Sequence, residues 1–120
     1  MARSLVVKVT CGAEAPERLA QAFTVAATAV AAGVATSKWL TGDAVWCAVP
    51  SRVPVLDLEH AAPLADLVEA VRLGGELTVC TQCAARRSLT EADLADGVRI
   101  AGAATFLEES LAEGAQALVY

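Results

Sequence analysis

The sequence predicts an α/β fold in which a parallel sheet is covered by helices on both faces. Short apolar, β-branched segments alternate along the chain with longer segments whose apolar residues recur at helical spacing. Turns rich in glycine, proline and aspartate separate these segments, and no internal repeat interrupts them. A length of 120 residues suits one domain, residues 1–120, with a sizeable hydrophobic core.

Two strands and one long helix are predicted in the N-terminal half. Residues 4–10 are mostly apolar and β-branched, which is typical of a central strand buried on both faces. A helix follows from Pro16, which fits the first helical position, to about Ala32, and Gly33 ends it. Because this helix is apolar on two sides, we expect one side to meet the sheet and the other to meet a second subunit. The half continues with a strand at 34–40, a turn at 41–43, a helical turn at 44–49 and an irregular segment at 50–60.

The C-terminal half repeats the alternation of helix and strand. An amphipathic helix begins at Pro63 and ends at Gly74-Gly75, and a third strand is predicted at 77–80. The smaller elements are a short helix at 83–87, a helical turn at 90–94, a turn at 96–97 and a last strand at 117–120. In a long helix at 101–113, the residues expected to face the core are Phe106, Leu107 and Leu111, and those expected to face solvent are Thr105, Glu108, Glu109 and Glu113. A sheet of four or five strands results.

A pair of cysteines lies where the third predicted strand passes into a helix. Cys80 and Cys83 are three positions apart and are followed by Arg86 and Arg87, the only adjacent basic residues in the chain. Backbone N–H groups at a helix N-terminus carry partial positive charge, which stabilises a thiolate and lowers the cysteine pKa. Ligands of parallel sheets bind outside the carboxyl ends of the strands, where Cys80 would lie. The pattern predicts an activated cysteine at Cys80, against the alternative that both thiols only fill the core.

The other titratable residues have weaker functional interpretations. Cys83 is expected either to resolve an oxidised or persulfidated Cys80 or to be a buried helix residue. Cys11 lies at the same sheet edge and is a third thiol, or else a residue packed under the first helix. We expect Cys47 to lie in the core and His60 at the surface.

Composition excludes several classes of function. A formal net charge of −5 with scattered basic residues gives no footprint for direct nucleic-acid binding. No secretory signal or membrane span is predicted, so we expect a cytoplasmic protein whose four cysteines are free thiols. With one Cys-x-x-Cys and one histidine, the chain lacks the ligands of a structural zinc site, and no Gly-rich fingerprint predicts a nucleotide or flavin cofactor.

Three stretches of the chain match recurring features of one known family. They are the cysteine loop from Val79 to Cys83 with the trailing Arg87, the turn Asp96-Gly97-Val98-Arg99-Ile100, and the ending Ala117-Leu118-Val119-Tyr120. In the N-terminal half the best local match is Leu40-Thr41-Gly42-Asp43. On these stretches the sequence resembles the DsrE/DsrF-like family, with its sulfur-relay (TusD) and YchN-type branches, over essentially the whole chain.

The resemblance implies a three-layer α/β/α fold and a homotrimer or homohexamer. It implies that Cys80 is the functional cysteine. Arg86 and Arg87 are expected either to bind an anionic sulfur species or to form a solvated helix face, and the resemblance favours Arg87 for the binding role. In the sulfur-relay branch this cysteine carries sulfur as a persulfide between donor and acceptor proteins. The family usually has glycine after the arginine, where this chain has Ser88; if the site needs positive φ, serine suits it poorly.

Three functions follow as hypotheses. The first is a sulfur carrier or sulfurtransferase-type protein that holds sulfane sulfur on Cys80. The second is a dithiol–disulfide oxidoreductase that uses Cys80 and Cys83. The third is an oligomeric binding protein whose cysteines are incidental, so the sequence leaves open whether the protein is an enzyme.

Overall fold

The computed structural model describes residues 2–120, which form five strands, four α-helices and two 3-10 helices. In chain order the elements are β1 (Ser4–Val9), α1 (Pro16–Ala31), β2 (Ala35–Leu40), η1 (Gly42–Ala48), α2 (Leu64–Gly74), β3 (Glu76–Cys80), α3 (Thr81–Arg86), η2 (Glu91–Asp93), β4 (Arg99–Ala101), α4 (Ala103–Ser110) and β5 (Ala115–Val119). The predicted alternation of strand and helix is therefore confirmed. No helix within that range is both long enough and apolar enough to cross a membrane.

All five strands run parallel in one sheet, in the order β4-β3-β2-β1-β5. On β1, Lys8 lies opposite Trp39 of β2 and Val119 of β5. Trp39 in turn lies opposite Thr78 of β3, two positions before Cys80. Because side chains alternate between the faces of a sheet, Lys8, Trp39 and Cys80 point to the same face.

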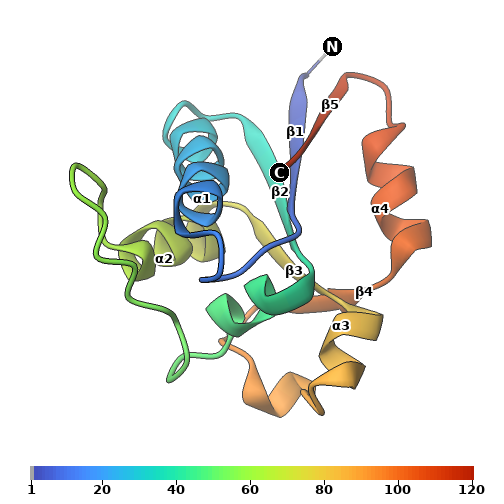
Figure 1. Ribbon diagram of the computed structural model, residues 1–120. Coiled ribbons are helices and arrows are strands. Elements are labelled where there is room, and N and C mark those ends of the chain that lie inside the picture. The colour runs from blue at the N-terminus through green and yellow to red at the C-terminus, as the bar shows by residue number, and fades with distance from the viewer. Residues whose placement is uncertain (1) are drawn as a thin grey trace.

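Helices cover the two faces of the sheet unequally (Figure 1). Helices α1 and α2 lie together on one face, and α4 lies on the other. The 3-10 helix η1 and helix α3 follow the carboxyl ends of β2 and β3, so they lie at that edge of the sheet. This is the three-layer α/β/α arrangement that the sequence predicts.

The hydrophobic core lies between the sheet and the pair α1 and α2. The strand residues on this face alternate with those on the face of α4, and the core members include Val7, Val9, Leu40, Leu77 and Val79, packed with Leu19 and Phe23 of α1. On the other face, α4 contributes no fully buried residue. The sheet is thus sealed on one side and only partly covered on the other.

The second apolar side of α1 packs against α2. A Cβ atom on Gly74 would lie only 2.3 Å from Cγ1 of Val30, so the glycine allows the two helices to approach closely. Helix α2 of the same chain therefore covers part of α1, and the expectation that one side of α1 meets a second subunit stays a prediction.

The orientation predicted for the last helix is correct for Phe106, which packs against Trp39, and wrong for Leu107, Leu111 and Glu109. Helix α4 begins at Ala103. The strand before it, at 99–101, was predicted partly as a turn and partly as the start of the helix. Leu107 and Leu111 are 57% and 76% exposed, whereas Glu109, expected in solvent, is half-buried. The cause is the sheet face beneath α4, which presents polar groups such as Ser37 and Arg99 that bind a carboxylate.

Candidate functional site

Cys80 lies at the junction of strand and helix that the sequence predicts. It is the last residue of β3 and the N-cap of α3, with extended backbone angles of φ −61° and ψ 131°. The cap position brings its sulfur to the free backbone N–H groups of Gln82 and Cys83 at the start of α3. The side chain is half-buried and faces the side of the sheet that α4 covers.

The thiol of Cys80 opens into a cavity of about 380 Å³ between the sheet and α4. The walls combine one ammonium group, hydroxyl and amide groups, two aromatic rings and two small residues, from Lys8, Trp39, Thr41, Cys80, Thr81, Gln82, Gly102, Ala103 and Phe106. The strand register explains the grouping, since Lys8 and Trp39 are neighbours across β1 and β2 on the face of Cys80. A second cavity, of about 400 Å³, lies beside α2, but its one thiol, Cys47, is only 2% exposed.

The surroundings of Cys80 favour its thiolate. Partial burial acts to raise the pKa of this thiol, but the backbone N–H groups of Cys83 and Gln82 act against it. The thiol of Cys83 and the ammonium of Lys8 add to that effect, and together these groups hold the pKa of Cys80 below its ordinary value. The site therefore contains a nucleophile with access to a cavity.

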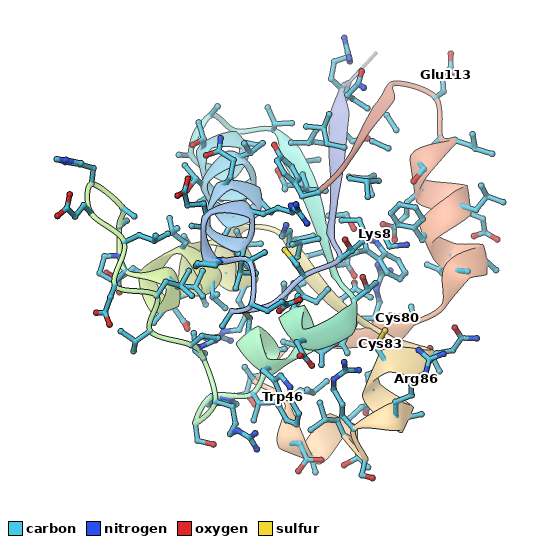
Figure 2. All side chains as sticks on the ribbon, viewed as in Figure 1. Lys8, Trp46, Cys80, Cys83, Arg86 and Glu113 are labelled. Carbon is cyan, nitrogen blue, oxygen red and sulfur yellow. The ribbon has the colours of Figure 1, made fainter. Side chains whose placement is uncertain are left out.

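Lys8 supplies the positive charge of the cavity and was not among the site residues predicted from the sequence. Its Nζ lies 4.6 Å from the centroid of the Phe106 ring, and Figure 2 shows it on β1 on the same side as Cys80. The signal was present in the sequence, because Lys8 is the one charged residue in an otherwise mostly apolar strand. Its role could not be assigned without the register that places it beside Trp39.

Cys83 is buried beside Cys80 and accepts a backbone hydrogen bond. The N–H of Gly42 donates to Sγ of Cys83 at 3.2 Å, which ties α3 to the start of η1. Gly42 has φ +56° and a Cβ at that position would lie 3.0 Å from the carbonyl oxygen of Thr10, so glycine suits the turn best. Cys83 is only 7% exposed, whereas Cys80 is half-buried.

Arg87 holds the short helix α3 in place. Its Nη2 and Nε donate to Oδ1 of Asp43 at 2.9 and 3.1 Å, and its Nη1 donates to the carbonyl oxygen of Cys83 at 3.1 Å. Arg86 is exposed and lies on the outer side of α3 in Figure 2. The anion-binding role of Arg87 stays a prediction, since the charged group that lines the cavity is Lys8.

Ser88 adopts the left-handed conformation that the family glycine would favour. Its φ is +55°, and it follows Arg87 at the end of α3. The N–H of Leu89 donates to the carbonyl of Ala84 at 2.9 Å and the N–H of Ser88 donates to that of Ala85 at 3.1 Å, which is the Schellman motif. The serine therefore keeps the helix end, at the cost of backbone strain.

The remaining cysteines and a buried lysine lie on the opposite face, in the core under α1. Burial raises the pKa of the Cys11 thiol, and burial raises the pKa of Cys47 to about 12, so neither is an activated nucleophile. Lys38 interacts electrostatically with both of these thiols. Its Nζ donates to the carbonyl of Ala22 at 3.2 Å and lies 4.8 Å from the Phe23 ring centroid. Burial lowers the pKa of Lys38 to about 7. The predictions of a core position for Cys47 and a surface position for His60 are confirmed.

A polar network fixes the aromatic wall of the cavity. Glu109 of α4 accepts hydrogen bonds from Nε1 of Trp39 at 3.0 Å, from the Ser37 hydroxyl and from Nη2 of Arg99 at 2.6 Å. Burial acts to raise the pKa of this carboxyl, but the three donors outweigh it and hold the pKa low. Glu109 was predicted to face solvent, so its support of the cavity wall was not expected from the sequence.

Metal-ligating groups do not cluster in the part of the chain that the structure describes: among residues 2–120 no three His, Cys, Asp or Glu side chains come together as a metal site. The chemistry available at Cys80 is therefore that of a thiolate beside an ammonium group and backbone donors.

Comparison with known proteins places this geometry in a family. The chain is similar in fold to the YchN protein from E. coli, with a TM-score of 0.81, 16% identity and coverage of 98% of this chain and 99% of that one. It is also similar to the protein of unknown function MTH1491 from Methanobacterium thermoautotrophicum, with a TM-score of 0.65, 13% identity and full coverage of both chains. The curated proteins gave no match. Residues 3–120 match the DsrE/DsrF-like family, and the chain belongs to that family.

Proposed function

We propose that this protein is a sulfur carrier of the sulfurtransferase type, in which Cys80 holds sulfane sulfur as a persulfide. Membership in the DsrE/DsrF-like family supports a role in sulfur relay. The observation that carries the proposal is the Cys80 thiol itself, stabilised as a thiolate while it faces an open cavity. A carrier needs one such nucleophile and a pocket that tolerates anionic sulfur.

The residues around Cys80 have separate roles in this proposal. Lys8 and the N–H groups of Gln82 and Cys83 stabilise the negative charge on the thiolate and then on the persulfide. Arg87 and Asp43 keep α3 against η1, which keeps Cys83 under Cys80. In the carrier, Cys83 acts as a neighbour that favours the thiolate and is not consumed.

Mass spectrometry of the intact protein after incubation with a persulfide donor tests the proposal. We expect the native protein and Cys83→Ser to gain one sulfur atom, and Cys80→Ser to gain none. Cys11→Ser is the matched control, because Cys11 is buried on the other face and should not affect sulfur uptake. Uptake that survives in Cys80→Ser would contradict the proposal.

One contact favours a second candidate, the dithiol–disulfide oxidoreductase. The Cys83 thiol lies close enough to Cys80 to lower the pKa of that thiol, so the two sulfurs are neighbours that a disulfide could join. The same variants separate the two functions. If Cys83→Ser is as inactive as Cys80→Ser and a Cys80–Cys83 disulfide forms readily, the oxidoreductase replaces the carrier.

We further propose that the protein works in the cytoplasm as a homotrimer or homohexamer that exchanges sulfur with donor and acceptor proteins. The support for assembly is an apolar surface on α4 and β5, formed by Leu107, Leu111 and Val119, all of which are more than half exposed. Leu107 and Leu111 belong to α4 and Val119 to β5, so a second copy packed on that side of the chain would remove these apolar side chains from water.

A further inference from the structure

The cavity in front of Cys80 contains a positive charge that has no carboxylate partner. Lys8 is half-buried, and none of the carboxylates in residues 2–120 forms a salt bridge with it. Its ammonium lies over the face of the Phe106 ring, which positions the charge without neutralising it. Removing a cation from water costs free energy, and the chain as a whole has a net charge of −5. The half-buried ammonium beside Cys80 therefore suits an anionic ligand that supplies the missing partner.

The cavity is also larger than sulfur alone requires. A volume of about 380 Å³ falls in the range of sites that hold small organic molecules, roughly 300–1,000 Å³. Trp39 and Phe106 meet edge to face, with ring centroids 5.4 Å apart, and give the cavity an apolar wall. Trp39 is itself only 1% exposed, so the part of this wall that is open to water belongs to the half-buried Phe106. A sulfide ion or one sulfane sulfur would leave that surface in water, whereas a short carbon chain would cover it.

We propose that the Cys80 cavity receives a small organic persulfide that carries a carboxylate, with its sulfane sulfur at Cys80 and its carboxylate at Lys8. The aromatic wall formed by Trp39 and Phe106 contacts the carbon chain between the two ends. This inference rests on the proposed function, since it concerns the same thiol; it replaces the donor protein of that proposal by a small molecule and leaves a protein as the acceptor.

The transfer step balances without another reactant. The Cys80 thiolate attacks the outer sulfur of R–S–SH and forms a new S–S bond. The S–S bond of the donor breaks, and its inner sulfur leaves as R–S⁻ with the electron pair. The proton stays on the transferred sulfur, so Cys80 becomes Cys80–S–SH, and Lys8 holds the carboxylate of R throughout.

Three donors of equal chain length test the proposal by charge alone. They are the persulfides of 3-mercaptopropionate, 2-mercaptoethanol and cysteamine, whose groups at the end away from the sulfur are anionic, neutral and cationic. We expect the carboxylate donor to transfer sulfur to the native protein about tenfold faster than the neutral donor, the factor of one charge-assisted contact. The cationic donor should be slower still. Equal rates for all three donors would overturn the inference while leaving the carrier function intact.

Variants assign the preference to Lys8. Lys8→Gln should reduce the ratio of the carboxylate rate to the neutral rate to about one, and Lys8→Arg should keep it. The ratio is taken within each variant, so a change in the Cys80 thiolate fraction cancels. Arg18→Gln removes the same charge from α1 on the opposite face and should leave the ratio unchanged. A preference that persists in Lys8→Gln, or a faster transfer from a peptide persulfide with an internal cysteine, would overturn the proposal.

A readout that needs no sulfur transfer separates this inference from the proposed function. Alkylation of Cys80 by iodoacetate and iodoacetamide compares an anionic and a neutral reagent at the same thiolate. Relative to a free model thiol, the native protein should favour iodoacetate, and Lys8→Gln should lose that preference. If no donor transfers sulfur but this preference is present, the carrier function fails and the carboxylate site stands; if the preference is absent, the site fails.

Discussion

Two residues occupy positions that would suit other amino acids better. Ser88 has φ +55° at the end of α3, a conformation that glycine adopts without strain. Lys38 is a fully buried amine whose three donors have one hydrogen-bond acceptor, the carbonyl of Ala22. Both residues lower the free energy of unfolding, and a substitution at each position measures by how much.

Ser88→Gly should stabilise the protein by about 1 kcal/mol, because glycine adopts the left-handed region without a Cβ clash. The measurement is the denaturant midpoint of equilibrium unfolding. Ser51→Gly is the matched control, since Ser51 is also an exposed serine but has no positive φ. An equal or lower midpoint for Ser88→Gly would show that the Schellman geometry carries no strain at this serine.

Lys38 should make stability rise with pH in a window that its pKa defines. The folded pKa is about 7 against an ordinary 10.5, so between these values the unfolded chain binds the proton more strongly. From pH 7 to about pH 8, below the range in which the thiols ionise in the unfolded chain, stability should increase by about 1 kcal/mol because of this group. Below pH 7 the folded protein must bury the charged ammonium, and the penalty is complete.

Lys38→Met isolates that effect, since it replaces the amine by an apolar chain of similar shape. We expect the variant to be more stable than the native protein at pH 7 and the difference to shrink toward pH 9. Cys80 titrates in both proteins, so its contribution cancels in the comparison. A difference that does not depend on pH would contradict the assignment to Lys38.

At the scale of elements, α4 is the least firmly held helix. None of its residues is fully buried, and two of its side chains attach it to the sheet. Phe106 packs against Trp39 and Lys8. Glu109 accepts hydrogen bonds from Ser37, Trp39 and Arg99. The helix forms one wall of the Cys80 cavity through Ala103 and Phe106. Its position therefore controls the shape of the candidate site.

Glu109→Ala should loosen α4 and destabilise the protein by about 1–3 kcal/mol, because Trp39 Nε1 and the Arg99 guanidinium lose their acceptor. Amide hydrogen exchange across 103–110 should become faster than in the native protein. Glu108→Ala removes the neighbouring carboxylate, which is exposed, and should change neither quantity. Equal exchange rates in the two variants would exclude Glu109 as the anchor.

The sequence predicted the elements better than their contacts. Cys80 was placed correctly because both signals for its position, the β-branched residues before it and the helix formers after it, are local in the sequence. The three-residue β4 was missed, since its pairing with β3 depends on partners far along the chain. The positions of Leu107, Leu111 and Glu109 on α4 were wrong because the sheet face beneath the helix is polar. The place of Lys8 beside the cavity follows only from strand register.

At the scale of the whole molecule, one face of the sheet is sealed and the other is not. The core lies on the side of α1 and α2, and the apolar surface of Leu107, Leu111 and Val119 lies on the side of α4 and β5. An isolated chain would leave this surface in water, next to the face that holds the Cys80 cavity.

We expect sedimentation velocity at micromolar concentration to show an oligomer, and the double substitution Leu107→Glu with Leu111→Glu to shift it toward monomer. Charges introduced at a buried apolar contact carry a desolvation cost that opposes assembly. Leu73→Glu is the matched control, because Leu73 is 71% exposed on α2, away from this surface. A monomeric native protein would contradict the proposed assembly.

The strand register has a consequence for how relatives of this chain can differ in length. Lys8 and Val9 are adjacent but point to opposite faces, one toward the cavity and the other into the core. Deleting one residue early in β1 would exchange them, which would place an ammonium among apolar side chains and a valine beside the thiol. Residues 50–63 form no strand, so a change in length there moves no side chain across the sheet. Insertions and deletions among relatives should therefore accumulate in that segment and be purged from β1 and β2.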